Sequence, residues 1–201
     1  MEPLTSLDWS QLETSEATLI ARCRAGEQAA CEQLVAEHQA MVFQLGCHLL
    51  GSRDEAYDLS QEVFLRVFRT IDRFRADASL KTWIYRIAIN QASNRRRFWS
   101  RRHRLGQVSL DAHVEVHGEP TEATDASSPH RILASKQLAE RLTVALDALP
   151  FDQRTVIILR EVEGLSYDEI AQALDIAVGT VKSRLTRARQ ALRASLGEVR
   201  L

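Results

Sequence analysis

A basic stretch near the C-terminus has the residue types and spacing to contact the edges of DNA bases. The stretch VGTVKSRLTRARQALR, residues 178–193, contains Lys182, Ser183, Thr186 and Arg187. In a helix these four lie opposite an apolar stripe that includes Leu185. Lysine and arginine can contact guanine or phosphate, and serine and threonine can bond either kind of group. The pattern predicts a DNA-reading helix or, alternatively, the solvated basic face of a packed helix.

The residues before this stretch complete a helix-turn-helix pattern. Ser166 and Glu169 have the spacing of a capping box, which marks the start of a helix. A short turn at Asp175 and Ile176 separates that helix from the basic one. In helix-turn-helix proteins the second helix enters the major groove, so residues 178–193 occupy the position of the reading helix.

Charge is segregated along a chain of 201 residues whose net charge is −1. Residues 78–110 contain eight bases and no acid, and residues 177–201 contain six bases and one acid. The sequence before and between these blocks is acidic. Two basic blocks separated by acidic sequence predict two nucleic-acid contacts on one chain.

Apolar residues recur at intervals of three and four along nearly the whole chain, which predicts helices and no strands. The residues expected to begin or end the first four helices are Ser15, Gly26, Gly51, Asp54, Ile71 and Ser79. A later helix with the apolar stripe Ala134, Leu138, Leu142, Ala145 and Leu149 is stopped by Pro150, and Gly164 is a predicted helix end.

Residues 103–130 differ from the rest, with two prolines, five acids and one arginine. This composition predicts a flexible linker of about 29 Å coil dimension, long enough for the two halves to lie well apart. The predicted fold class is therefore all-α, with two small helical domains joined by a flexible linker. The domains are an N-terminal extension at 1–14, a first domain at 15–102, the linker at 103–130, and a second domain at 131–201 containing the helix-turn-helix.

The cysteines do not form a recognisable metal or disulfide pattern. The chain has an odd number of cysteines, Cys23, Cys31 and Cys47, and their spacing is not that of metal ligands. Buried thiols are the expected state. The alternative is a zinc or redox site that includes His48. No triad, nucleotide loop or metal cluster is recognisable, so we expect neither enzyme activity nor a cofactor. The chain has no membrane-spanning run or signal peptide, which favours a cytoplasmic location.

Two parts of the sequence resemble one protein family. LREVEGLSYDEIAQALDIAVGTVKSRLTRAR, residues 159–189, resembles the C-terminal domain of bacterial sigma factors of the extracytoplasmic-function (ECF) group, although luminescence-regulator-type activators share a similar helix-turn-helix. DEAYDLSQEVFLRVFRTIDRF followed by SLKTWIYRIAINQASNRRR resembles the N-terminal sigma domain, in the same order. The resemblance covers residues 15–102 and 131–197.

The resemblance implies a protein that binds core RNA polymerase and directs it to promoter DNA. In this family the N-terminal domain docks on the clamp helices of the largest polymerase subunit, and the flap region is a second polymerase contact. The docking contact maps onto Asp58, Gln61, Glu62 and Leu65. Leu65 is an apolar residue on a polar helix face, which independently suits an interface, the alternative being an ordinary solvated face.

The same domain opens the promoter −10 element in this family. Melted strands are held by aromatic stacking and a basic track, and a flipped base needs a polar group to read its edge. The residues implied for the −10 contact are Phe74, Lys81, Trp83, Tyr85, Arg86, Asn90, Asn94, Arg95 and Arg97. Asn90 and the loop from Phe74 to Lys81 form the expected base pocket, while Trp83 and Tyr85 could instead be core aromatics.

The C-terminal domain is expected to read the −35 element as duplex DNA. By the resemblance, Lys182, Ser183, Thr186 and Arg187 face base edges, and Arg160, Tyr167 and Arg189 contact phosphates. An anti-sigma factor that covers both binding faces is an expected partner. The alternatives are a stand-alone helix-turn-helix regulator that binds operator DNA without polymerase, and an enzyme or metal sensor that uses the three thiols and His48.

Overall fold

The computed structural model describes residues 9–104 and 129–197, and the greater part of the predicted linker lies outside these residues. All regular secondary structure in the described ranges is helical, which confirms the all-α class. None of the described helices is both long and apolar enough to cross a membrane.

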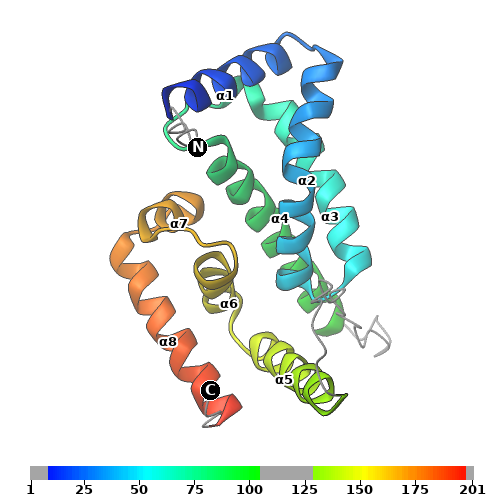
Figure 1. Ribbon diagram of the computed structural model, residues 1–201, viewed down its shortest axis with the longest axis vertical. Coiled ribbons are helices and arrows are strands. Elements are labelled where there is room, and N and C mark those ends of the chain that lie inside the picture. Colours follow the sequence, from blue (N-terminus) through cyan, green and yellow to red (C-terminus); the bar gives the residue numbers. More distant parts are fainter. Residues whose placement is uncertain (1–8, 105–128, 198–201) are drawn as a thin grey trace, which may run out of the picture.

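The first half contains four long helices (Figure 1). They are α1 (Trp9–Arg24), α2 (Gln28–Leu50), α3 (Arg53–Thr70) and α4 (Leu80–Arg104), with a 3-10 turn, η1 (Ile71–Arg73), after α3. Helix α1 begins six residues before Ser15, the predicted start. No glycine or proline lies between Trp9 and Ser15, so nothing in the sequence prevents the helix from extending in that direction.

Backbone capping sets the other boundaries of this half. Gly51 ends α2 in the left-handed conformation, with φ 74°, and its N–H donates to the carbonyl of Cys47. The Ser52 hydroxyl accepts from the Glu55 N–H at 3.3 Å at the start of α3. Ser79 accepts from a backbone N–H one turn into α4 at 3.1 Å, as the sequence predicts.

The second half contains the predicted helix-turn-helix. Its elements are α5 (Pro129–Asp147), α6 (Phe151–Ile157), a π-helical turn, η2 (Ile158–Val162), α7 (Tyr167–Leu174) and α8 (Val178–Leu196). Both bonds of the Ser166–Glu169 capping box form, at 3.2 and 2.8 Å. Asp175 makes the turn in the left-handed conformation, and Ala177 precedes α8 without a side-chain cap.

The apolar core of the first half lies where α2, α3 and α4 meet. Its fully buried side chains include Leu34, Val42, Leu45, Leu59, Val63, Val67, Ile84 and Ala88. Their spacing of three and four residues follows the predicted apolar faces. This packing fixes the faces of α3 and α4 that point away from the core.

The apolar stripe predicted on α5 is buried at one end. Ala145 and Leu149 are buried, whereas Leu138 and Leu142 are exposed. The stripe is buried toward its C-terminal end, where the chain continues into α6, and the side chain of Ala134 lies outside the described residues.

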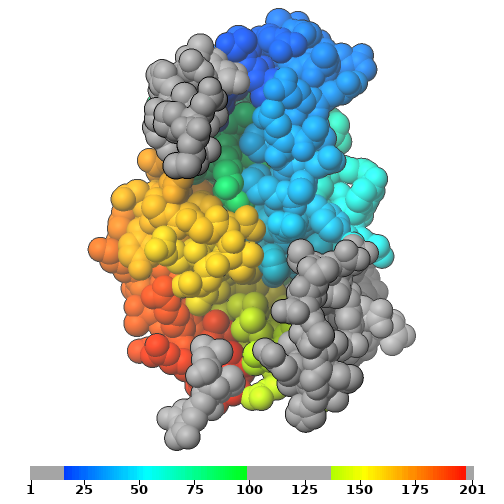
Figure 2. Space-filling model, viewed as in Figure 1, coloured from blue at the N-terminus to red at the C-terminus, as the bar shows by residue number. Residues whose placement is uncertain are grey.

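The described parts of the two halves pack against each other. Helix α7 lies beside α4, and α6 lies close to α2 (Figure 1). The buried apolar residues of both halves form one continuous cluster. In the space-filling view, the surface of the second half directly meets that of α2 (Figure 2).

Candidate nucleic-acid interface

The side of α8 that carries the predicted base contacts is exposed in the described part of the chain. Lys182, Ser183, Thr186 and Arg187 are exposed, and α8 runs along the outer edge of the molecule (Figure 1). The opposite side of the helix is held in the core by Val181, Leu185 and Ala188. The hydroxyls of Ser183 and Thr186 donate to carbonyls within α8, at 2.9 and 3.0 Å. Each hydroxyl oxygen keeps its capacity to accept a hydrogen bond.

The ring of Tyr167, itself a predicted phosphate contact, lies beside two of the predicted DNA-contacting cations. The Arg160 guanidinium lies 5.1 Å from the ring centroid and donates to the Leu165 carbonyl at 2.8 Å. The Lys182 ammonium lies 6.0 Å from the same ring. Tyr167 at the first position of α7 therefore brings cations from η2 and α8 together at one end of the helix-turn-helix.

Arg189 has an intramolecular partner in this arrangement. It pairs with Glu161 at 2.6 Å, and this hydrogen bond raises the pKa of the Arg189 guanidinium. Both side chains are about half exposed, at 45% and 51%. Exposed pairs of this kind contribute little free energy, so phosphate can compete for Arg189.

The predicted −10 residues of α4 differ widely in exposure. Those that are exposed are Lys81, Asn90, Asn94 and Arg97. Those that are partly exposed are Trp83, Arg86 and Arg95. Phe74 and Tyr85 are buried, so both rings lie in the core. For Tyr85, a core position is the alternative to strand binding that the sequence left open.

Phe74 and Trp83 form an aromatic pair beside the loop that precedes α4. Their ring centroids are 5.2 Å apart with a tilt of 54°. The buried Phe74 ring supports the partly exposed indole of Trp83. Asn90 lies seven residues after Trp83, so both lie on one side of α4. This is the geometry of a stacking ring followed by an amide.

The predicted docking face lies on the solvent side of α3. Asp58, Gln61 and Glu62 are exposed, and the Leu65 side chain is 55% exposed. Tyr57, which the sequence interpretation missed, is 61% exposed and lies eight residues before Leu65 on the same side. The available signal was this helical spacing. Two large apolar side chains among acids are an unusual combination for a face that contacts only water.

One ion pair connects this face to the basic block. Arg95 of α4 donates to both carboxylate oxygens of Glu62, at 3.3 and 2.7 Å. Glu62 belongs to the predicted docking face and Arg95 to the predicted −10 contacts. The two candidate sites therefore meet along the α3–α4 edge.

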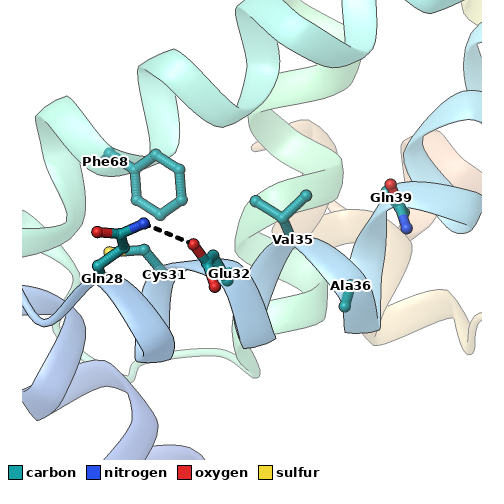
Figure 3. Close-up of a pocket in the computed structure, with 7 residues that line it drawn as sticks. All are labelled: Gln28, Cys31, Glu32, Val35, Ala36, Gln39 and Phe68. Atoms are coloured by element: carbon teal, nitrogen blue, oxygen red, sulfur yellow. Dashed lines mark hydrogen bonds between the residues drawn. The ribbon is translucent and has the colours of Figure 1, made fainter.

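A shallow groove of about 330 Å³ lies along α2 beside α3 (Figure 3). Its lining residues are Gln28, Cys31, Glu32, Val35, Ala36, Gln39 and Phe68. The Gln28 carboxamide donates to Glu32 at 2.8 Å. The exposed surface of this lining is mostly apolar.

The cysteine–histidine alternative has no metal geometry in the described ranges. Cys23 is buried, Cys31 and Cys47 are partly buried, and burial raises the pKa of the Cys23 thiol to about 11. Within these ranges no three histidine, cysteine or acidic side chains are grouped to hold a metal ion.

Comparison with known proteins identifies both halves of the chain. Residues 34–102 match the family model of Sigma-70 region 2, and residues 139–192 match that of Sigma-70, region 4. The chain is 37% identical over 182 residues to the ECF RNA polymerase sigma-E factor of Escherichia coli (strain K12), covering 89% of this chain and 92% of that protein. The chain belongs to the ECF sigma factors of the sigma-70 family.

A second relative of this sigma factor is the RNA polymerase sigma-H factor of Pseudomonas aeruginosa, 35% identical over 178 residues, with 89% of this chain and 92% of that protein covered. A solved structure of CnrH in complex with the cytosolic domain of CnrY superposes with a TM-score of 0.65 at 25% identity, covering 90% of this chain and 96% of that one. The sigma factor RpoE of Bartonella quintana, solved in complex with the anti-sigma factor NepR, superposes with a TM-score of 0.66 at 26% identity. The match covers 84% of this chain and 98% of that one.

These comparisons establish the class of activity. The sigma factor family consists of transcription initiation factors rather than enzymes, and the chain functions as an ECF sigma factor. The predicted docking residues of α3 and the predicted −10 residues of α4 fall within the region 2 match, and the predicted −35 residues fall within the region 4 match.

Proposed function

We propose that this sigma factor distributes promoter recognition over three surfaces. Its first domain, residues 15–102, binds core RNA polymerase through α3 and the melted −10 strand through α4. Its second domain, residues 131–201, reads the −35 duplex through α8. The observation that carries the proposal is that α3, α4 and α8 each keep an exposed set of candidate contact side chains on the side away from the core, although Phe74 and Tyr85 are buried. Its site of action is the cytoplasm, with the polymerase.

The contact with polymerase combines apolar burial and charge. Leu65 and Tyr57 supply apolar area, and Asp58 and Glu62 supply negative charge on the same face of α3. Such a face suits a basic helical partner, as expected of the clamp helices. Docking over Glu62 competes with its bond to Arg95 and makes that guanidinium available to DNA.

The contact with the melted strand combines stacking and charge. Trp83 offers an aromatic ring, and Asn90 offers an amide that can read the edge of a flipped base. Lys81 and Arg97 provide a basic track for the strand backbone, and the buried Phe74 holds Trp83 in place. Asn94 and Arg95 extend this track along α4.

We further propose that an anti-sigma factor binds this chain when it is not bound to polymerase. The solved sigma factors CnrH and RpoE are described in complex with CnrY and with the anti-sigma factor NepR. An apolar patch flanked by acids on α3 and an exposed basic α8 give such a partner two separate surfaces of opposite charge to cover.

The overall proposal is tested by its dependence on polymerase. Core enzyme with this protein, on fragmented genomic DNA, should produce transcripts from discrete start sites that neither component produces alone. Sequencing the 5′ ends identifies the promoters. Tight binding of promoter duplex by the free chain, unchanged by core enzyme, would instead support the stand-alone regulator.

Replacing Arg187 with alanine should weaken binding to the −35 duplex by about ten- to a hundredfold and leave core-polymerase binding unchanged. A bidentate contact to a base contributes about 1–3 kcal/mol of discrimination. Holoenzyme affinity for a labelled −35 duplex measures the effect. Arg184→Ala is the control, because Arg184 carries the same charge in the same helix but pairs with Asp152 at 2.7 Å. A loss of core binding in Arg187→Ala would contradict the division of surfaces.

Replacing Asn90 with alanine should leave −35 duplex binding intact and reduce open-complex formation by about tenfold. An amide reading a base edge makes one or two hydrogen bonds, each contributing about 1 kcal/mol. Permanganate reactivity of the melted strand, measured with holoenzyme on a supercoiled promoter, reports opening. Gln44→Ala removes an exposed amide from α2 and serves as the control. Wild-type permanganate reactivity in Asn90→Ala would rule out the base pocket.

A further inference from the structure

The loop of residues 74–79, which connects η1 to α4, has a backbone conformation that its own sequence does not favour. Ala76 has φ 58°, in the left-handed region, although it is not a glycine. Side chains with a Cβ rarely adopt this conformation, and they keep it where the surrounding structure fixes it. The ion pair within the loop, Arg75 with Asp77 at 3.4 Å, is largely exposed and contributes little. The 74–79 loop therefore relies on other elements for its shape.

Arg24, the last residue of α1, holds the chain before Ala76. Its Nε donates to the Ile71 carbonyl at 3.2 Å, and its Nη2 donates to the Phe74 carbonyl. A guanidinium is planar and presents its N–H groups in a fixed fork. One side chain of α1 therefore fixes two carbonyls of η1 and the loop relative to each other.

Glu16, about two turns earlier in α1, holds the chain after Ala76. Its carboxylate accepts from the N–H of Leu80, the first residue of α4, at 2.9 Å. The Ser79 hydroxyl accepts from the Thr82 N–H at 3.1 Å. The first N–H groups of a helix have no partner within the helix, and they favour a negative charge nearby. Glu16 and Ser79 therefore share the capping of α4.

Helix α1 thus spans the 74–79 loop from one end to the other. It packs against η1, and it lies across the loop and the start of α4 (Figure 1). Glu16 and Arg24 are eight residues apart, which corresponds to about 12 Å along a helix. Because both side chains bind backbone groups at the ends of the loop, α1 acts as a rigid spacer between those ends.

The backbone that α1 holds carries the proposed contacts to the melted strand. Arg24 binds the carbonyl of Phe74, whose ring centroid lies 5.2 Å from that of Trp83. Glu16 binds the first N–H of the helix that carries both Trp83 and Asn90. A binding site needs its groups held to within about 0.5 Å of the productive geometry. The contacts from α1 therefore bear on how the stacking ring and the amide meet the loop.

We propose that Glu16 and Arg24 are positioning residues for −10 recognition, through which α1 holds the 74–79 loop and the start of α4 in the geometry that receives a flipped base. Neither side chain contacts the strand, and each acts through the backbone that it binds. This inference rests on the proposed −10 function of α4. Loss of either residue should reduce the contribution of the captured base, while the attraction of the basic track for phosphates remains.

The test compares strand binding with and without the captured base. Holoenzyme is titrated with a fluorescein-labelled non-template −10 strand of a promoter identified by 5′-end sequencing. It is also titrated with the same strand carrying one abasic site at each position in turn. The ratio of the two affinities, measured by fluorescence anisotropy, is the abasic penalty. Partial unfolding or weaker core binding lowers both affinities alike, so a purely structural defect leaves this penalty unchanged.

The wild-type chain should show an abasic penalty of about tenfold at the captured base, and Arg24→Ala should lower it to about twofold. Arg22→Ala is the matched control, because Arg22 lies in the same last turn of α1 but donates to Glu27 at 2.7 Å. It should keep the wild-type penalty. Equal penalties in Arg24→Ala and Arg22→Ala would overturn the role of Arg24.

Glu16 is tested by a conservative pair of variants. Glu16→Gln keeps an oxygen that can accept from the Leu80 N–H and should retain most of the penalty, whereas Glu16→Ala should lower it to about twofold. A full penalty in Glu16→Ala would overturn the role of Glu16. If no abasic site weakens binding of the wild-type chain, the base-reading function of α4 fails and this inference fails with it. A wild-type penalty that persists in both alanine variants overturns only the part assigned to α1.

Discussion

Replacing Leu65 with aspartate should lower the affinity for core RNA polymerase by at least about a hundredfold and abolish promoter-dependent transcription. Full burial of a leucine contributes about 1.5–3 kcal/mol, and 1.4 kcal/mol corresponds to a factor of ten. An unpaired carboxylate placed in the same contact adds a desolvation cost. Because the side chain is 55% exposed in the free chain, the fold should tolerate the change.

Binding of fluorescently labelled variants to purified core enzyme measures this effect. Val144→Asp is the control, since Val144 is 70% exposed on α5 and belongs to none of the surfaces proposed here. Thermal unfolding of both variants checks that the fold is retained. Wild-type affinity of Leu65→Asp for core enzyme would show that α3 is not the docking element and that polymerase binds another face of the first domain.

Helix boundaries governed by local chemistry could be predicted from the sequence. Ser79 accepts the expected backbone hydrogen bond at the start of α4. Ser166 and Glu169 form both of the reciprocal bonds of the predicted capping box. Gly51 adopts the left-handed conformation that ends α2. Each of these signals acts over three or four residues, so neighbouring sequence contains all the information required.

The environment of Tyr85 could not be predicted in the same way. Helical spacing places it on a face of α4, but its partner Glu163 lies 78 residues later in the chain. Periodicity cannot say which distant element covers a face. The same holds for Arg154, which donates to the carbonyl of Leu49, 105 residues earlier in the chain. Arginine is seldom buried, so the residue type does not predict a buried position.

The exposed apolar area of α3 could be predicted only in part, for a related reason. Leu65 stands out in the sequence because leucine is clearly apolar among acids. Tyr57 lies on the same side of α3 but does not stand out, since tyrosine is common in both core and surface positions. Only the packing of α3 on α2 and α4 shows that the Tyr57 ring is turned to solvent.

Replacing Gly46 with leucine should destabilise the chain by about 3 kcal/mol and lower its melting temperature by roughly 10 °C. Gly46 is buried in α2 where this helix crosses α3. A Cβ at this position would lie 3.0 Å from the Cβ of Ala56 and 3.1 Å from its Cα. The neighbour is backbone rather than a flexible side-chain end, so the two helices must move apart.

Gly179→Leu in α8 is the matched control for this prediction. It makes the same change in a helix, but an added Cβ there meets nothing within 4 Å. The better helix propensity of leucine should leave stability unchanged or raise it by about 0.5 kcal/mol. Circular dichroism melting of both variants measures the difference, and similar melting temperatures would show that the α2–α3 crossing can adjust.

The position of Gly46 also connects stability to docking. Helix α3 packs on α2 through Ala56 and Leu59, and carries Asp58, Glu62 and Leu65 on its other side. Separation of the two helices should therefore reduce core-polymerase affinity together with stability. Adding Ala56→Gly removes the Cβ closest to the new side chain and should restore part of both. Recovery of stability without recovery of binding would show that the docking face does not depend on this crossing.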